Sequence, residues 1–421
     1  MDLLAYPSSS TTELAGLRVL IIVENLPVPF DRRVWLEART LRQAGAEVSI
    51  ICPTGSGYEA LEQEIDGIRI FRHAIASDAG SAGGYLREYS SALFAETRLA
   101  WKIFFRHGFD VIHACNPPDL IFLVALPFRL VGRKFIFDHH DICPELYEAK
   151  FDRRDLLWRL LRLVERLTFA CAHVSIATNE SYRAIAIGRG GMKPENVFVV
   201  RSGPDVERLA PVPPNPAFKQ GKTYLVSYVG VMGEQEGIDL LLEAVRHIVH
   251  DLGRTDIQFT LAGAGPAFES LKALARSLGV ETYAAFLGRV PDETLFTLLS
   301  TADVCVNPDR VNPMNDLSTM NKIMEYMAMG KPIVQFDVTE GRYSAQEASL
   351  YAAKNDARDF AARILELLDD EPRRAAMGRS GRERVTRELC WQRQISALIS
   401  AYRKAFEGER ARRVEQVKRA T

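Results

Sequence analysis

The sequence predicts an α/β protein with two doubly wound domains, each built on a parallel β-sheet. Apolar runs of strand length alternate with segments of helical periodicity, which is the pattern of repeated βαβ units. The alternation stops at a proline-rich stretch, residues 211–216, and then starts again. A chain of 421 residues is also too long for one ordinary hydrophobic core. We interpret residues 211–222 as a linker between the two domains.

The composition is that of a globular protein with no general affinity for nucleic acid. Apolar residues make up 47% of the chain and charged residues 25%. The 53 basic residues balance 54 acidic ones, which argues against a broad electrostatic contact with nucleic acid. The cysteines form no Cys-x-x-Cys pair, so we expect reduced thiols rather than disulfides or zinc ligands. Residues 1–16 lack the features of a signal peptide and no long uncharged apolar run exists, so we expect a cytoplasmic protein.

The first half begins with a strand at residues 18–24, a continuous apolar run of the kind that is buried on both faces. Asp31 is expected to cap the following helix, which carries Arg32 and Arg33 in its first turn and ends at Gly45. Further strands are predicted at 47–52, 68–72, 111–114, 134–138, 174–178 and 196–201, and further helices at 85–106, 120–130, 153–169 and from Asn179.

Polar residues follow two of these strands. Asn116 lies just after the strand at 111–114, and the run from Asp138 to Asp141, which contains His139 and His140, ends the strand at 134–138. Ligands of parallel sheets bind beyond the carboxyl ends of the strands, so both segments are candidates for a site. A metal site is one interpretation of the His-His-Asp run, although adjacent rings rarely face one ion. A core histidine paired with an aspartate is another.

The predicted helix at 153–169 is amphipathic and basic. Arg159, Arg162 and Arg166 share one stripe beside an apolar arc. Such a helix can lie on an anionic membrane, or it can pack on the core and leave its arginines solvated. Both interpretations remain open at this stage.

The second half repeats the alternation, with strands predicted at 223–230 and 257–263 and helices at 238–249, 267–278 and 292–300. Residues 318–334 form its most distinctive stretch. An apolar helix face is predicted there from Met320, Ile323, Met324 and Met327, with Ser318 or Thr319 as the cap. Gly330 and Pro332 are expected to end the helix, and a buried strand should follow at 333–336.

Three polar residues share one side of that helix: Asn321, Lys322 and Glu325. A carboxylate at this place can accept both hydrogens of a vicinal diol, such as that of a ribose. The first turn of a helix also suits a phosphate, because its N–H groups are free and its dipole end is positive. The alternative is an amphipathic helix with a solvated Lys–Glu pair.

The stretch from Glu325 to Val334, Glu-Tyr-Met-Ala-Met-Gly-Lys-Pro-Ile-Val, resembles the donor-site signature of retaining, nucleotide-sugar-dependent glycosyltransferases of family 4. Four further segments resemble the same family in the same order: residues 229–233, 261–266, 286–291 and 302–304. The resemblance spans about residues 18–390 and is strongest after 223. It implies the GT-B fold, in which two Rossmann-like domains face a cleft, with the acceptor in the first domain and the nucleotide sugar in the second.

The resemblance also implies domain limits and residue roles. Residues 1–210 would form the acceptor-side domain, 223–390 the donor domain, and 391–421 a terminal part whose helix crosses back to the first domain. Glu325 would bind the ribose of the nucleotide. His140, with His139 as its rival, would contact the donor sugar near the reacting carbon. The acceptor side would include Arg32, Arg33 and Asn116, and the donor side Gly230, Gly263, Gly265, Arg201, Arg289, Asp316, Ser318, Thr319, Asn321 and Lys322.

The chain departs from the family pattern where the diphosphate is usually held. Val231 and Glu236 stand where many members carry Arg and Lys, and Leu317 replaces a Glu that contacts the donor sugar, with Asp316 beside it as a substitute. We expect Glu236 to face solvent. Lys322 is then the predicted main contact of the diphosphate, with the helix start at 318–320 and Arg201 assisting and Arg289 beside the base.

These features predict a retaining glycosyltransferase that moves a sugar from a nucleoside diphosphate to a surface polysaccharide or a lipid-linked oligosaccharide. No metal or other cofactor is expected, because cationic side chains and a helix N-terminus can stabilise the leaving diphosphate. The expected partners are the nucleotide sugar, the glycan or lipid-linked acceptor and, through 153–169, a membrane surface. Two alternatives remain open: a nucleotide-sugar 2-epimerase and a non-catalytic nucleotide-sugar-binding protein.

Overall fold

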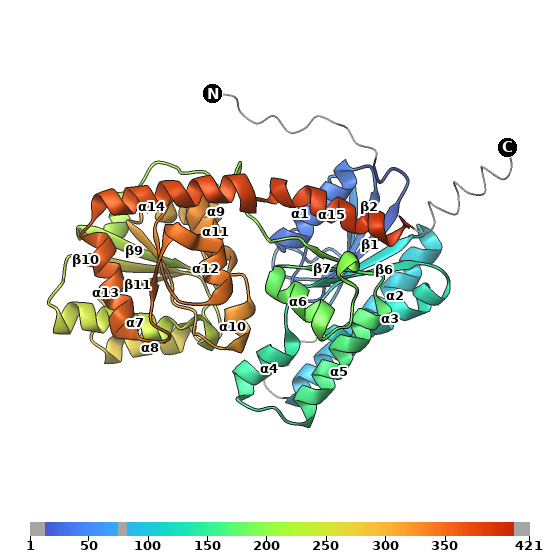
Figure 1. Cartoon of the computed structure of the whole chain (residues 1–421), viewed down its shortest axis with the longest axis horizontal. Helices are drawn as coiled ribbons and strands as arrows, with labels where there is room; N and C mark the ends of the chain where they lie inside the picture. The colour runs from blue at the N-terminus through green and yellow to red at the C-terminus, as the bar shows by residue number, and fades with distance from the viewer. Residues whose placement is uncertain (1–12, 75–81, 408–421) are drawn as a thin grey trace. The chain divides into compact units, whose positions relative to one another are not determined.

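The computed structural model describes residues 13–74 and 82–407, which belong to two compact units (Figure 1). Unit 1 runs to Val200 and resumes at Ile395, and unit 2 comprises Arg201–Gln394. The proline-rich stretch is not a free linker, because it packs within unit 2. The N–H of Val212 donates to Ser300 Oγ at 2.9 Å, and that of Asn215 donates to Thr301 Oγ1 at 2.8 Å.

Unit 1 is built on an eight-stranded sheet in the order β3-β4-β2-β1-β5-β6-β7-β8. Its strands are β1 Arg18–Ile22, β2 Glu47–Pro53, β3 Glu62–Ile65, β4 Ile68–His73, β5 Val111–Cys115, β6 Lys134–His139, β7 Val174–Ala177 and β8 Val197–Val199. Only β3, which pairs with β4, is antiparallel to its neighbour. The prediction of a doubly wound parallel sheet is therefore confirmed for this unit.

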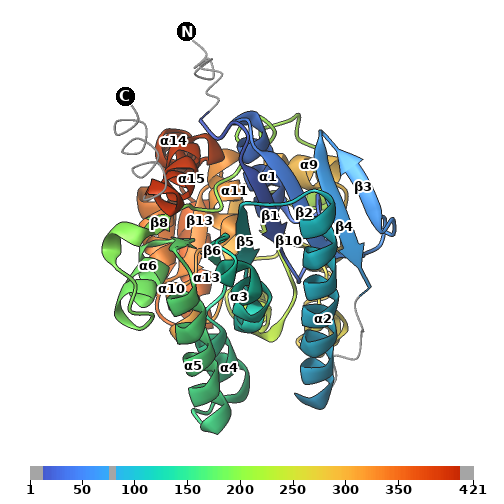
Figure 2. The ribbon, with the colours of Figure 1, turned by 90° about the vertical axis from the view of Figure 1, so that its right-hand side faces the viewer.

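Helices cover both faces of this sheet. They are α1 Arg32–Gln43, α2 Ala82–Arg106, α3 Phe122–Leu130, α4 Cys143–Phe151, α5 Leu156–Cys171, α6 Glu180–Gly188 and, from the end of the chain, α15 Trp391–Ala405. Right-handed crossovers place α1 on one face and α2, α3 and α5 on the other. The latter three helices run in one layer in Figure 2, where α3 packs against both α2 and α5.

Most predicted elements of unit 1 are confirmed, with shifts of a few residues at their ends. Asp31 caps α1 as predicted, because its carboxylate accepts the N–H of Val34 at 3.1 Å. Two elements were not predicted: the strand β3 and the helix α4. The basic helix begins at Leu156 rather than at 153, with Asp155 as its cap. The residues 75–81, between β4 and α2, lie outside the described part.

Unit 2 is built on a six-stranded, fully parallel sheet in the order β11-β10-β9-β12-β13-β14. Its strands are β9 Tyr224–Val229, β10 Ile257–Ala262, β11 Ala284–Gly288, β12 Val304–Asn307, β13 Ile333–Phe336 and β14 Ser349–Ala352. Its helices are α7 Ile238–Arg246, α8 Phe268–Ser277, α9 Asp292–Thr301, α10 Pro313–Leu317, α11 Asn321–Ala328, α12 Thr339–Ala345, α13 Ala357–Leu368 and α14 Glu371–Arg384. The second doubly wound domain is confirmed as well.

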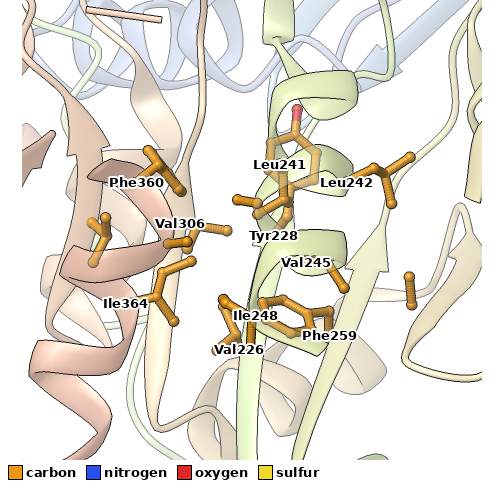
Figure 3. Close-up of a cluster of buried hydrophobic side chains, with 14 of the residues drawn as sticks. Val226, Tyr228, Leu241, Leu242, Val245, Ile248, Phe259, Val306, Phe360 and Ile364 are labelled. Atoms are coloured by element: carbon orange, nitrogen blue, oxygen red, sulfur yellow. The ribbon is translucent and has the colours of Figure 1, made fainter. Parts of the chain in front are cut away.

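The core of unit 2 lies between the sheet and the helices α7 and α13. Figure 3 shows Val226, Phe259 and Val306 of the strands meeting Val245 of α7 and Ile364 of α13, and all of them are buried. A second buried cluster contains the alternate strand residues Leu225, Cys305 and Ile333, so the strands of this sheet are buried on both faces. The core fixes the carboxyl edge of the sheet, where the glycine turns after β9 and β10 lie.

The helix α11 carries the apolar face that its spacing predicted. Ile323, Met324 and Met327 are fully buried, and Gly330 follows the helix in the left-handed conformation with φ of 67°. The predicted cap is wrong, since Met320 occupies the N-cap position without a side-chain hydrogen bond. Ser318 instead ends α10, where its Oγ donates to the carbonyl of Met314 at 2.7 Å.

No helix within 13–74 and 82–407 has the length and apolarity needed to span a bilayer.

Candidate active site

The turn after β6 in unit 1 is held by Asn116. Its Oδ1 accepts the N–H of His140 at 2.7 Å and that of Asp141 at 3.1 Å, and its Nδ2 donates to Asp119 at 2.7 Å. Asn116 is buried. It was predicted on the acceptor side, but the structure uses its side chain to shape the backbone beneath His140.

His140 is oriented by one of its ring nitrogens. Nε2 lies 2.6 Å from Asp138 Oδ2 and 2.9 Å from Arg33 Nε, which itself lies 3.3 Å from Asp138 Oδ2. An ionised carboxylate can only accept and a guanidinium can only donate, so in the tautomer with a proton on Nε2 both His140 and Arg33 donate to Asp138. Nδ1 has no hydrogen-bond partner among the described residues, and the side chain keeps 16% of its surface exposed.

Arg33 is the centre of the buried charges below His140. Its Nη2 lies 2.9 Å from Asp138 Oδ1 and 3.1 Å from Glu37 Oε1, and its Nη1 donates to the carbonyl of Val200 at 2.8 Å. Arg33 is itself buried, so its predicted place on the acceptor side is wrong for a direct contact. Arg32, its neighbour in α1, is exposed.

The pKa values of the two buried carboxyl groups are shifted in opposite directions. Burial alone would raise the pKa of Asp138, but Arg33 and the two histidines around it lower that pKa well below its usual range. Burial raises the pKa of Glu37 well above its usual range, and the charge of Asp138 adds to this effect while that of Arg33 opposes it. Asp138 is therefore the ionised acceptor of His140.

A link from the far end of the chain completes the network. Tyr402 of α15 lies with its Oη 2.8 Å from His113 Nδ1, and His113 Nε2 lies 3.3 Å from Asp138 Oδ2. Burial lowers the pKa of His113, so the ring carries one proton, which Nε2 donates to Asp138, while Nδ1 accepts from the tyrosine. Sequence reasoning missed Tyr402, because no local pattern links positions so far apart.

The same cluster contains four side chains of metal-ligating type. Ligand atoms of Glu37, His113, Cys115 and Asp138 all lie within 4.8 Å of one another. The guanidinium of Arg33 already supplies a cation to Glu37 and Asp138, and it is too deeply buried to move into solvent. The donor set therefore fits an ion-paired core better than it fits a metal site.

His139 lies on the other side of the strand among aromatic rings, and its Nε2 is 3.7 Å from Oε1 of the buried Glu165. It is fully buried, its ring lies 5.1 Å from the ring centroids of both Phe169 and Tyr182, and neither of its ring nitrogens has a hydrogen bond. Burial, with the nearby charge of Arg189, lowers the pKa of His139 to about 3. A neutral, enclosed ring cannot reach a substrate, so of the two histidines only His140 suits that role.

In unit 2, two glycine turns meet at the carboxyl edge of the sheet, after β9 and β10. Gly230 and Gly263 have φ of 154° and 150°, and a Cβ on Gly263 would lie 1.7 Å from the carbonyl oxygen of Gly230. A Cβ on Gly265 would lie 2.4 Å from the carbonyl oxygen of Met232. These glycines let the two turns pack backbone against backbone.

The helix α11 is fixed above this edge by Tyr326. The Oη of Tyr326 accepts the N–H of Val229 at 2.8 Å, which ties the helix to the end of β9. Lys322, one turn earlier, lies with Nζ 2.7 Å from Asp309 Oδ1 and 5.0 Å from the ring centroid of Tyr228. Glu325 is half-buried on this helix, and Asn321 at its start is exposed.

The prediction for Glu236 is wrong. Its Oε2 accepts the N–H of Gly233 at 3.0 Å, so the carboxylate closes a turn rather than facing solvent. Burial raises the pKa of Glu236, while the charge of Lys322 lowers it and that of Asp309 raises it. Lys322 therefore has carboxyl groups on two sides. Burial alone would lower the pKa of Lys322, but Asp309 raises it and keeps the amine charged.

Other predicted donor residues form contacts within unit 2. Both carboxylate oxygens of Asp316 accept from Thr339, the backbone N–H at 2.9 Å and the hydroxyl at 3.0 Å. Arg201 is buried, with its Nη1 3.3 Å from Glu340 and 3.4 Å from Thr319 Oγ1. Arg289, after β11, is exposed. The structure thus brings Arg201 and Thr319 together, and it pairs Lys322 with Asp309.

Two family descriptions match the chain. Residues 31–208 match Glycosyltransferase Family 4, and residues 223–370 match Glycosyl transferases group 1. The first match lies in unit 1 apart from its last residues, and the second lies in unit 2. The two matches together cover most of the chain.

Individual proteins agree with these matches. D-inositol 3-phosphate glycosyltransferase of Corynebacterium aurimucosum is 24% identical over 229 residues, which are 51% of this chain and 53% of that protein. The chain spans about half the length of the curated relatives it matches. Sucrose-phosphate synthase from Thermosynechococcus elongatus has a TM-score of 0.76 at 18% identity, over 93% of this chain and 100% of that one. HepE of Anabaena, solved in complex with UDP-glucose, has a TM-score of 0.66 at 14% identity, over 94% and 100%. These likenesses establish the fold as two α/β domains of GT-B type.

Proposed function

We propose that the chain is a retaining enzyme of the glycosyltransferases that carry a family 4 domain followed by a group 1 domain, because residues 31–208 and 223–370 match these two descriptions. It moves a sugar from a nucleoside diphosphate sugar to a surface polysaccharide or a lipid-linked oligosaccharide, in the cytoplasm at the inner face of the membrane. The observation that carries the proposal is the placement of Lys322 and Glu325 on one helix at the carboxyl edge of the unit 2 sheet.

The donor is held by unit 2. Glu325 accepts the hydroxyls of the ribose, and Lys322 meets the diphosphate. An ammonium group has three N–H donors, and Asp309 takes only one of them in the structure. The turns at Gly230 and Gly263 pack backbone against backbone at the same edge, and a Cβ on Gly230 would lie 3.2 Å from Lys322 Cε, so these turns adjoin the lysine.

The reaction does not need strong general acid or base catalysis, since a nucleoside diphosphate is a good leaving group. The protein has to position the two substrates and to stabilise the negative charge that develops on the phosphate. His140 contributes a polar contact near the reacting carbon through Nδ1, and Asp138 keeps the ring in the tautomer that leaves Nδ1 as an acceptor. In this proposal no metal or cofactor takes part.

The epimerase alternative has no support from the family matches or from the individual relatives. A non-catalytic binding protein differs from the proposed enzyme in one property, which is turnover. The two are therefore separated by a functional assay.

The test has two steps. Thermal-shift screening of UDP-, GDP- and ADP-sugars identifies the donor by the stabilisation that ligand binding brings. Proton NMR of the product formed with that donor then reports the anomeric configuration at the earliest time points. The proposal predicts release of nucleoside diphosphate with the configuration of the donor retained. Inverted product, or binding of a donor without turnover on any glycan or lipid-linked acceptor, would contradict it.

A further inference from the structure

The helix α5 has two apolar sides, and only one of them is buried. Thr168 and Phe169 face the interior of unit 1 together with Glu165. Opposite them, Leu156, Leu160, Leu163 and Leu167 recur at intervals of four, three and four residues, which places them on a single stripe, and all four are exposed. An exposed leucine is ordinary, but a continuous stripe of them is not.

The neighbouring helix α3 extends this apolar surface. Leu123, Leu126 and Leu130 share one side of α3 and are exposed, while Val124 and Phe128 on the opposite side are buried. The two helices pack against each other on the same face of the sheet, as Figures 1 and 2 both show. Arg129 of α3 donates to the carbonyls of Ala170 and Cys171 at the end of α5. Both leucine stripes therefore point away from the sheet.

The exposed charged residues beside the leucine stripe of α5 are all arginines. Arg159, Arg162 and Arg166 are exposed and lie along one edge of the leucines. The single acidic residue of α5, Glu165, is buried and paired with Arg189, whose Nη2 donates to it at 2.7 Å. No acidic residue occurs in α3. An apolar stripe flanked by arginines matches a surface with an apolar interior and anionic head groups.

We propose that the outer faces of α3 and α5, named here the leucine face, seat unit 1 on an anionic lipid bilayer. The leucines enter the boundary between head groups and acyl chains, and the arginines stay at the level of the lipid phosphates. The chain runs from His140 through α4 directly into α5, so the face belongs to the same region of unit 1 as the candidate catalytic histidine. The inference does not depend on catalysis, because membrane binding can be measured without turnover.

Flotation of the full chain with vesicles tests the proposal. Vesicles of phosphatidylcholine with phosphatidylglycerol should carry the protein at low salt, vesicles of phosphatidylcholine alone should carry much less, and added salt should weaken the binding. Substitution of Arg159, Arg162 and Arg166 by Gln should lower the partition coefficient roughly a hundredfold at low salt. The matched control replaces Arg276, Arg358 and Arg379 by Gln, three exposed arginines of unit 2, and should bind like the wild type.

The apolar part is tested by Leu160→Gln with Leu163→Gln. These side chains are 50% and 53% exposed, so their loss should not disturb folding. The control pair, Leu61→Gln with Leu252→Gln, changes leucines that are 60% and 49% exposed elsewhere on the chain. The first pair should lose flotation even at low salt, and the second should keep it. Absence of flotation on anionic vesicles, or equal behaviour of the two pairs, would overturn the proposal. The proposal would also be overturned by a concentration-dependent dimer that Leu160→Gln with Leu163→Gln abolishes and the control pair does not. A second copy of the chain would then cover the leucine face.

Discussion

His139 and His140 are adjacent in the chain and lie in opposite environments, because successive residues of a strand end point to opposite sides. His139 is enclosed by aromatic rings, whereas His140 keeps exposed surface and is oriented by Asp138. We therefore expect replacement of His140 to change activity and replacement of His139 to change stability.

Replacing His140 by Ala should lower kcat by roughly a hundredfold, the scale of losing one aligned polar contact at a reacting centre. The affinity for free nucleoside diphosphate should stay near normal, since the proposed function assigns that ligand to unit 2. Steady-state kinetics with calorimetry on the same samples checks both statements. His139→Phe is the control and should keep kcat. If His139→Phe lowered kcat and His140→Ala did not, the assignment of His140 would be wrong.

His139 should make the free energy of unfolding depend on pH. Its folded pKa of about 3 lies below the ordinary value, so between these two values the unfolded chain binds a proton that the folded chain does not. Protonation therefore favours unfolding, and stability should fall as the pH drops from about 6.5, by at most about 1.4 kcal/mol per pH unit. His139→Phe should remove this part of the slope.

Urea unfolding at pH 7 and at pH 5 measures the effect of His139. The raised pKa values of Glu165 and Asp119, about 6 and about 7, give a slope of opposite sign. The comparison must therefore be made between variants and not from the wild type alone. His250→Phe, at an exposed histidine, should keep the wild-type slope. An unchanged slope in His139→Phe would show that folding does not lower the pKa of His139.

At the scale of elements, the helix α15 returns to unit 1 and brings Tyr402 to the network below His140. Tyr402→Phe keeps the ring but leaves His113 Nδ1 buried without a donor, which should cost about 1–3 kcal/mol of stability. The freed His113 can turn or change tautomer, so kcat and its pH dependence should change while KM for the donor stays near normal.

Tyr351→Phe is the matched control, because the hydroxyl of Tyr351 also donates to a neighbour, the carbonyl of Gln346 at 2.7 Å, but lies in unit 2. Chemical unfolding and the pH profile of kcat are measured for both variants. A Tyr402→Phe enzyme that was less stable but had the wild-type pH profile would reduce Tyr402 to a packing residue.

Elements with a strong periodic pattern could be predicted from the sequence, and weak ones could not. The strands β1 and β2 are mostly apolar because they are buried on both faces. The strand β3 reads Glu-Gln-Glu-Ile and is mostly exposed at the sheet edge, so no apolar pattern reveals it. The helix α4 has little amphipathic character and was missed for the same reason.

Only those parts of the candidate site that lie within one short segment could be predicted from the sequence. Glu325 and Lys322 share one helix, so their spacing alone places them together. Arg33 and Asp138 are far apart in the chain, and only the parallel register of β5 with β6 and the packing of α1 bring them together. The inward turn of Glu236 depends on one hydrogen bond to a backbone N–H, which no composition or spacing shows.

At the scale of the whole molecule, the two units repeat one architecture with different chemistry at the carboxyl edges of their sheets. Unit 1 gathers a buried, ion-paired network that ends in His140. Unit 2 gathers glycine turns and a lysine held by Asp309. This division supports the central claim of the proposed function, which is that unit 2 holds the donor.

Calorimetric titration of a nucleoside diphosphate and of the matching nucleoside tests that claim most directly. Glu325→Ala should weaken both ligands by a similar amount, about 1–3 kcal/mol, because both contain the ribose. Lys322→Ala should weaken the diphosphate and leave the nucleoside nearly unchanged, which also shows that the variant is folded. Glu293→Ala and Lys354→Ala, at exposed positions of the same unit, should bind both ligands normally. Unchanged affinities in both site variants, or equal losses for both ligands in Lys322→Ala, would contradict the placement of the donor on this helix.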